Sequence, residues 1–421
     1  MMRLFMLVSA FLLLAGSGPL CGQELSDIEQ LGKSIFFDEN LSINGNQSCA
    51  ACHGPAVGWT GPIPAFNEFG SVYEGSIAGR FGNRKPPSAA YATQSPILAF
   101  HRQGNSGLFL GGNFWDGRAT GEKLGNPAAD QAQGPFLNPA EQALPDNACV
   151  VYFVCTADYP VTFESVWGAC DIAWPGDVPA QCASEGGMVA LSDADAMRVE
   201  EIYDQVALAI AAYEGSAEVN AFTSRYDAYL AKALKLSSME RKGLALFNGK
   251  AKCSNCHPNK ARMGEAPLFT DFSYDNLGLP RNRDNPVYAN EGDDWVDEGL
   301  GGFLESRPEY AGMAEEHAGA QKVPTLRNVD LRPDPGFVKA YGHNGYFKTL
   351  KGIVHFYNTR DVKPTCPDPF TSEAEALAQD CWPEPEVPEN VNDNELGDLK
   401  LSDEDEDAIV EFLKTLSDGY F

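Results

Sequence analysis

Two short stretches of this 421-residue chain decide its fold, Cys49-Ala50-Ala51-Cys52-His53 and Cys253-Ser254-Asn255-Cys256-His257. In a Cys-x-x-Cys-His motif both thiols form thioether bonds to the vinyl groups of a haem, and the adjacent histidine ligates the iron. Zinc ribbons also pair two Cys-x-x-Cys motifs, but only about 15–20 residues apart, and redox dithiol proteins carry one. Here the motifs begin at residues 49 and 253, and each has its own histidine. The sequence therefore predicts two covalently bound c-type haems, with zinc or redox dithiols as the alternative.

The N-terminus has the pattern of an export signal. Arg3 precedes an apolar run over residues 4–14, and small residues follow at positions 15–18. This pattern predicts a signal peptide over residues 1–22 and a mature protein in the periplasm or outside the cell. The apolar run is too short to span a bilayer, and no later stretch is long and apolar enough to do so. Cys21 allows a lipoprotein interpretation, but the residues just before it lack the small side chain expected ahead of a lipidated cysteine.

The remaining cysteines indicate disulfides. Of 11 cysteines, four belong to the haem motifs and Cys21 to the leader, which leaves Cys149, Cys155, Cys170, Cys182, Cys366 and Cys381. In an oxidising compartment an even number of spare thiols predicts three disulfides. The simplest pairing places two within the 149–182 segment and one between Cys366 and Cys381, although six thiols allow fifteen connectivities. We interpret them as structural staples on long loops rather than as a redox centre.

The chain is strongly acidic, with a net charge of −28. Acidic residues are dense over 403–407 and between Glu291 and Glu298. Because like charges repel, we expect no nucleic acid and no membrane as partner, whereas a basic or neutral protein partner is compatible. We interpret the acidic runs as solvated surface and helix N-termini rather than as a docking site.

The chain repeats itself in outline. A capping box at Ser26 starts a predicted helix that runs towards Phe37, and a capping box at Ser237 starts one that runs to Phe247. A haem motif follows each of them. Later in each half, apolar residues at helical spacing predict a closing helix, over 199–213 and over 402–416. A first helix, a haem motif and a closing helix describe a cytochrome c-like unit.

The predicted fold class is therefore mainly α, with two cytochrome c-like haem domains and long irregular loops. The expected N-terminal domain covers residues 23–225, with a cysteine-rich insertion at 149–182, and the expected C-terminal domain covers residues 226–421. Irregular structure is predicted for the long Gly- and Pro-rich connections at 54–112, 258–310 and 358–400.

Further motifs lie between and around the haem-binding stretches. They are Asn113-Phe114-Trp115-Asp116-Gly117-Arg118-Ala119, Gln131-Ala132-Gln133-Gly134-Pro135, Asn138-Pro139-Ala140-Glu141, Leu268-Phe269-Thr270-Asp271 and Val323-Pro324-Thr325-Leu326-Arg327-Asn328-Val329. In this order the motifs resemble those of the bacterial diheme cytochrome c peroxidases and of the related MauG-type enzymes. The resemblance covers most of residues 26–416 and implies an enzyme that reacts with hydrogen peroxide.

The resemblance implies roles for residues near the first haem, which has His53 as its proximal ligand and reacts with peroxide. Gln131 and Glu141 are expected on its open face, with Pro135 helping to shape the pocket. Trp115 is expected between the two haems, as a stepping stone for electrons. Cleavage of a peroxide O–O bond needs a group that takes a proton from one oxygen and returns it to the other, which a carboxylate can do. Spacing alone would allow a helix-start glutamate and a core tryptophan.

At the second haem, His257 is the ligand on one side, and the resemblance places the sixth ligand at Tyr357. Ordinary peroxidases of the family supply Met there and MauG-type members supply Tyr, and no Met lies nearby in this sequence. A phenolate is a hard anionic donor that favours higher oxidation states of iron. The alternative ligand is His355. The other histidines are expected to form hydrogen bonds, namely His101, His317 and His343.

Two further departures from the ordinary peroxidases concern the surroundings of the haems. Many ordinary members carry a histidine that blocks the first iron until the second haem is reduced. The matching stretch here, residues 75–84, has none, so an open position is expected on the first haem unless His101 supplies the ligand. The family's calcium ion between the haems is doubtful, because Lys85 takes roughly the place of its Asn ligand and the loop from Leu331 to Lys339 is longer.

These features lead to three functional hypotheses. A MauG-like enzyme would oxidise an aromatic residue of a partner protein through a high-valent diheme state formed with hydrogen peroxide. An ordinary diheme cytochrome c peroxidase would reduce hydrogen peroxide with electrons from a small cytochrome or copper protein. A plain diheme electron carrier would have two six-coordinate haems and no use for Gln131 and Glu141. Tyr357 and the missing loop histidine favour the MauG-like hypothesis.

Overall fold

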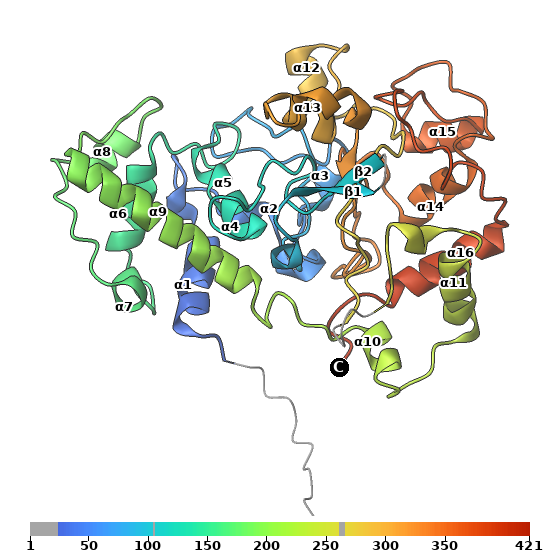
Figure 1. The fold of residues 1–421 in the computed structure, drawn as a ribbon, viewed down its shortest axis with the longest axis horizontal. Coiled ribbons are helices and arrows are strands. Elements are labelled where there is room, and N and C mark those ends of the chain that lie inside the picture. The colour runs from blue at the N-terminus through green and yellow to red at the C-terminus, as the bar shows by residue number, and fades with distance from the viewer. Residues whose placement is uncertain (1–23, 104–105, 261–265) are drawn as a thin grey trace, which may run out of the picture.

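The computed structural model describes residues 24–103, 106–260 and 266–421 (Figure 1). The predicted signal peptide and Cys21 lie outside the described residues. Helices are the main regular structure, as predicted, and the strands of the described residues form two short antiparallel pairs. None of the described helices combines the length and the apolar character that a membrane crossing requires.

Short helices make up most of the regular structure of both halves. The first half contains α1 (Asp27–Phe36), α2 (Cys49–Cys52), α3 (Pro64–Glu68), α4 (Pro127–Ala132), α5 (Gly134–Leu137), α6 (Asn147–Thr156), α7 (Phe163–Trp167), α8 (Val178–Cys182) and α9 (Asp193–Glu214). The second half contains α10 (Arg225–Leu230), α11 (Ser238–Asn248), α12 (Val287–Glu291), α13 (Gly299–Glu305), α14 (Leu350–Thr359), α15 (Glu373–Gln379) and α16 (Asp403–Lys414). The strand pairs are β1 (Ala99–Gln103) with β2 (Ser106–Leu110), and β3 (Tyr274–Asp275) with β4 (Gln321–Lys322).

The four helices predicted around the haem motifs are present as α1, α9, α11 and α16. Both predicted capping boxes form, since the backbone N–H of Ser26 donates to Glu29 at 2.7 Å and that of Ser237 donates to Glu240 at 2.6 Å. Helix α9 begins earlier than its apolar pattern indicates, because the Ser192 side chain caps it. The acidic run 403–407 forms the first turns of α16, where negative charge favours the helix dipole.

Each half contains one close helix crossing. Helix α1 packs against α9, and α11 packs against α16 (Figure 1). A Cβ atom on Gly32 of α1 would lie 1.8 Å from the carbonyl oxygen of Ala209 in α9. One on Gly243 of α11 would lie 1.9 Å from the carbonyl oxygen of Ala408 in α16. No side chain fits either position, so glycine lets both helix pairs approach backbone to backbone.

Two separate clusters of buried apolar residues correspond to the two halves. The buried members of one lie between Leu31 and Val219, and those of the other lie between Tyr226 and Leu416. The boundary between residues 225 and 226 stays a prediction.

A third, smaller cluster explains a hairpin that the sequence did not indicate. The strands β1 and β2 lie in a stretch for which irregular structure was expected. Buried Leu98 and Phe109, at this hairpin, pack with Leu300 and Leu304 of α13. The hairpin is thus stabilised by a segment far away in the sequence, a contact that local patterning does not reveal.

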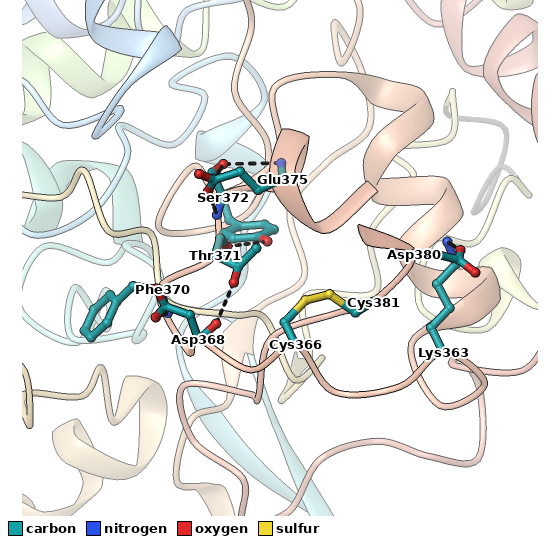
Figure 2. The surroundings of a disulfide bond; sticks show 10 residues. Lys363, Cys366, Asp368, Phe370, Thr371, Ser372, Glu375, Asp380 and Cys381 are labelled. Atoms are coloured by element: carbon teal, nitrogen blue, oxygen red, sulfur yellow. Dashed lines mark hydrogen bonds and ion pairs between the residues drawn. A yellow bond between two sulfur atoms is a disulfide. The ribbon is translucent and has the colours of Figure 1, made fainter. Parts of the chain in front are cut away.

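The local disulfide pairing predicted from the cysteine positions is confirmed. Cys149 bonds to Cys182 and Cys155 to Cys170 within the insertion of the first half. Cys366 bonds to Cys381 at the two ends of the segment that contains α15 (Figure 2). Beside this bond, a Lys363–Asp380 ion pair of 2.7 Å adds a second link between the same two ends of the segment (Figure 2).

Candidate haem sites and the tryptophan between them

The first haem motif forms a single helical turn that holds its histidine in a defined direction. The backbone N–H of His53 donates to the carbonyl of Cys49 at 3.0 Å, directly after α2. The Nδ1 atom of His53 lies 3.2 Å from the carbonyl oxygen of Trp59. A carbonyl only accepts, so in this contact Nδ1 carries the proton and Nε2 keeps a free lone pair. His53 lines a cavity that is open to solvent and has a volume of about 740 Å³ including that open space.

The second motif repeats this arrangement with different residues. A 3₁₀ turn over Cys253–Asn255 carries it, and the backbone N–H of His257 donates to the carbonyl of Cys253 at 2.9 Å. The Nδ1 atom of His257 lies 2.8 Å from the carbonyl oxygen of Phe269, which again leaves Nε2 free. Cys253, Cys256 and His257 line a second cavity of about 1710 Å³, which is open to solvent.

Both cavities suit a covalently bound haem. Among the described residues the cysteines without a disulfide are those of the two motifs, Cys49, Cys52, Cys253 and Cys256. Burial lowers the pKa of His53 and of His257, which favours the neutral imidazole that ligates iron. The second cavity also has buried polar atoms without a hydrogen-bond partner, the amide of Gln321 and Nε2 of His343, which a bound group could satisfy. The second cavity is lined by its whole motif, whereas the first is lined by His53 and not by Cys49 or Cys52. With this difference, the residues present fit one haem at each motif.

Trp115 is one of several residues that line both cavities, and among the described residues that do so it is the aromatic one. It is buried, and its side chain belongs to the lining of both. Its indole N–H donates to the carbonyl of Lys85 at 2.8 Å. The neighbouring Asp116 pairs with Arg84, whose guanidinium also binds Asp297 with two hydrogen bonds of 2.6 Å. These buried ion pairs hold the segment that contains Trp115 and Asp116 against Asp297 in the second half of the chain.

The three residues expected on the open face of the first haem occupy different positions. Gln131, on α4, lines the first cavity. Glu141 and Pro135 are not among the residues that line it. Glu141 nevertheless lies near the motif: burial raises the pKa values of the Cys49 and Cys52 thiols, and the charge of Glu141 adds to the rise. Burial raises the pKa of Glu141 itself, and the Arg118 guanidinium opposes that shift.

The two alternative ligands of the second haem lie on opposite sides of α14, since residues two apart on a helix point in nearly opposite directions. Tyr357 lines the second cavity, and burial raises the pKa of its hydroxyl. His355 does not line that cavity. Its Nδ1 lies 2.9 Å from the Oε1 of buried Glu406, and its ring packs against Trp382. The structure therefore brings Tyr357, and not His355, to the cavity of His257.

The remaining histidines lie away from the space beside His53. His101 is exposed on β1 and lines neither cavity. The ring of His317 packs edge-on against Phe109 at 5.2 Å. His343 lies beside Trp115, with ring centroids 6.4 Å apart, and its Nε2 is 3.6 Å from Glu386.

Two lining residues were missed by the sequence analysis. Glu214, at the end of α9, lines the first cavity, and burial raises its pKa to about 8. Glu214 comes four residues after Ile210 and so lies on the apolar face of the helix, and this position could have indicated a buried glutamate. Lys322, on β4, lines both cavities and donates to the hydroxyl of Ser95 at 2.6 Å, and burial lowers its pKa to about 7. No local pattern distinguishes this lysine from a surface one.

Comparison with known proteins agrees with this geometry. The sequence model of the family described as di-haem cytochrome c peroxidase matches residues 26–235. The chain is 34% identical over 424 residues to the methylamine utilization protein MauG of Paracoccus denitrificans (strain Pd 1222), covering 99% of this chain and 96% of that protein. It is 26% identical over 334 residues to the cytochrome c551 peroxidase of Nitrosomonas europaea, covering 79% of this chain and 72% of that protein.

A solved structure shows the same fold. The diheme peroxidase BthA from Burkholderia thailandensis E264 superposes with a TM-score of 0.71 at 29% identity, covering 94% of this chain and 87% of that one. Identity to a MauG protein over almost the full length, together with two Cys-x-x-Cys-His motifs whose histidines each line a cavity, leads to one assignment. The chain belongs to the di-haem cytochrome c peroxidase and MauG family and is a peroxidase-type oxidoreductase.

Proposed function

We propose that this chain is a MauG-like enzyme. It uses hydrogen peroxide at the first haem site to withdraw electrons from an aromatic residue of a partner protein, through the second haem site and Trp115. The observation that carries the proposal is the position of Trp115, whose side chain lines both cavities. Tyr357 in the second cavity supports it, because a phenolic oxygen favours oxidised iron.

Haem bound in each cavity supplies an iron that exchanges electrons with peroxide or with a partner. The residues that line each cavity determine which side chains can ligate the iron there. His53 and His257 each offer an Nε2 lone pair whose direction is fixed by a carbonyl at Nδ1. Among the described residues that line the first cavity, His53 is the only histidine, so no second imidazole there competes with peroxide.

The positioning of peroxide is assigned to Gln131, and the proton transfer is assigned to Glu141. The Gln131 amide both donates and accepts hydrogen bonds, so it can hold peroxide in the first cavity. Glu141 would take a proton from one peroxide oxygen and return it to the other. The O–O bond would then break and the protonated oxygen leave as water, with a bound haem supplying the two electrons that the cleavage consumes. Burial raises the pKa of Glu141, which brings its proton exchange closer to neutral pH than that of an exposed glutamate.

Trp115 is suited to pass electrons between the sites. Its ring is buried, and its N–H is fixed on the Lys85 carbonyl, so it holds one orientation between the cavities. We place the reaction in the periplasm or outside the cell, because the three disulfides form in oxidising compartments. The acidic surface fits a basic or neutral protein partner.

An ordinary cytochrome c peroxidase is the second candidate, favoured by relatives of that name such as the one from Nitrosomonas europaea. The two functions differ in whether the ferric protein must be reduced by one electron before it reacts with hydrogen peroxide. We therefore propose to compare peroxide consumption by the fully ferric protein with consumption after reduction by one electron. A MauG-like enzyme reacts at once in the ferric form. Reaction only after reduction would favour the ordinary peroxidase.

A further inference from the structure

One buried lysine connects the two halves of the chain next to the haem sites. The side chain of Lys339 is enclosed, with 4% of the residue exposed. Its Nζ donates to three backbone carbonyls, those of Val57 at 2.8 Å, Asn328 at 2.6 Å and Leu331 at 3.0 Å. Val57 follows the first haem motif, whereas the other two belong to the second half. A single amino group therefore links segments that are far apart in the sequence.

A second buried lysine lies beside the first. Lys85 donates through Nζ to the hydroxyl of Thr60 at 2.9 Å and to the carbonyl of Pro86 at 3.2 Å. Its backbone carbonyl accepts the indole N–H of Trp115, and its backbone N–H donates to the carbonyl of His343. Both lysines line the second cavity. The pair is thus in contact with the segments that position Trp115.

The calcium ion implied by the family resemblance does not fit this place. Calcium needs six to eight oxygen ligands, and the carbonyl oxygens of Val57, Asn328 and Leu331 are occupied by an ammonium group. Burial lowers the pKa of Lys339 well below its ordinary value, and the nearby charge of Lys85 lowers it further, so an added divalent cation would meet the same repulsion from Lys85. The group of possible metal ligands found among the described residues lies elsewhere, at Cys256, Asp275 and Glu395, and includes a cysteine of the second haem motif.

We propose that the ammonium group of Lys339, with Lys85 beside it, is a built-in cation that joins the two haem-binding halves in place of a divalent metal ion. The geometry suits the charged form, because an ammonium has three N–H donors for three carbonyl acceptors, whereas a neutral amine has two. Lys339 is then a positioning residue for the second haem site and for Trp115.

The first test uses the purified diheme protein. Metal analysis should find no calcium at the stoichiometry of the chain, and dialysis against EGTA should leave the melting temperature and the electron paramagnetic resonance of both haems unchanged. Stoichiometric calcium whose removal changes either signal would overturn the proposal.

The second test replaces the cation. Lys339→Met keeps the length of the side chain but removes a donor from three carbonyls and leaves those of Val57 and Leu331 without one, so the melting temperature should fall by about 5 °C or more. Loss of a buried positive charge should also lower the midpoint potential of the second haem, which a purely structural role would not require. Lys235→Met, at an exposed lysine, is the control and should change neither quantity. An unchanged potential in Lys339→Met would overturn the proposal. If that variant does not fold, the calcium and EGTA measurements on the unaltered protein decide.

Discussion

At the scale of single residues, backbone carbonyls determine what the two motif histidines can do. The contacts of His53 with Trp59 and of His257 with Phe269 fix both the tautomer and the ring orientation. A hydrogen bond at Nδ1 also makes the opposite nitrogen a better donor to a metal. Close to the first motif, burial shifts the proton affinities of Glu141 and Glu214 upwards. These shifts can be tested by substitution.

The first prediction concerns the proton transfer. Glu141→Gln keeps the shape of the side chain and removes its ability to carry a proton, so the peroxide reaction should slow by about 10²–10⁴. Haem content should stay at two per chain. Stopped-flow absorbance after mixing with peroxide measures the rate. Gln131→Ala should have a smaller effect, because Gln131 holds peroxide rather than transferring a proton. If Glu141→Gln reacted with peroxide as fast as the unaltered protein, Glu141 would not transfer the proton and its role would be structural.

The second prediction concerns Glu214 and pH. Burial raises its pKa from the ordinary value of 4.5 to about 8. A carboxyl with a raised pKa stabilises the folded state below its ordinary pKa, and this contribution is lost as the pH rises through the folded value. The unfolding free energy of the unaltered protein should therefore fall, relative to that of Glu214→Gln, between about pH 4.5 and pH 8. Urea titrations at several pH values measure it, and a difference independent of pH would contradict the burial of an ionisable Glu214.

Sequence reasoning reached some of these residues and not others. His53, His257 and their cysteines follow from a motif whose chemistry is local. Trp115, Gln131 and Tyr357 came from the resemblance, and the structure places all three at the cavities. Glu214 and Lys322 were missed, because they reach the cavities from α9 and β4, and only the folded chain brings these elements there.

At the scale of elements, the two helix crossings are the main shared feature of the halves. The capping boxes and apolar spacings predicted these four helices, since both signals are local. The hairpin of β1 and β2 was not predicted, because its apolar side chains pack on the distant helix α13. The same reason explains why the close approach at Gly32 and Gly243 was not foreseen.

The third prediction tests one crossing. In Gly243→Ala the new Cβ would lie 1.9 Å from the Ala408 carbonyl, so α11 and α16 must separate. We expect a loss of unfolding free energy of at least about 2 kcal/mol, the middle of the range for overpacked cores. Thermal or urea unfolding followed by circular dichroism measures it. Gly312→Ala is the matched control, because a Cβ there meets no atom within 4 Å. Equal unfolding free energies of Gly243→Ala and Gly312→Ala would contradict this prediction, because α11 and α16 would then separate without a loss of stability.

At the scale of the whole molecule, two similar halves are joined by many polar contacts, and two groups of them involve segments next to Trp115. Arg84 pairs with Asp116 and Asp297, and Lys339 binds carbonyls from both halves. Between them lies Trp115, which borders both cavities. Such an arrangement suits an enzyme in which one site meets peroxide and the other meets a protein partner. We propose that oxidation at the first site is shared with the second.

The most direct test of this claim adds one equivalent of hydrogen peroxide to the fully ferric diheme protein without any reductant and records the near-infrared absorption. We expect a new, long-lived charge-resonance band, because Trp115 lets the oxidising equivalents spread over both haems. In addition, Tyr357 favours oxidised iron at the second haem. Tyr357→Met should retain both haems and lose the band, and Trp115→Phe should form it more slowly. A ferric protein that shows no band, and that consumes peroxide only after reduction by one electron, would contradict the account.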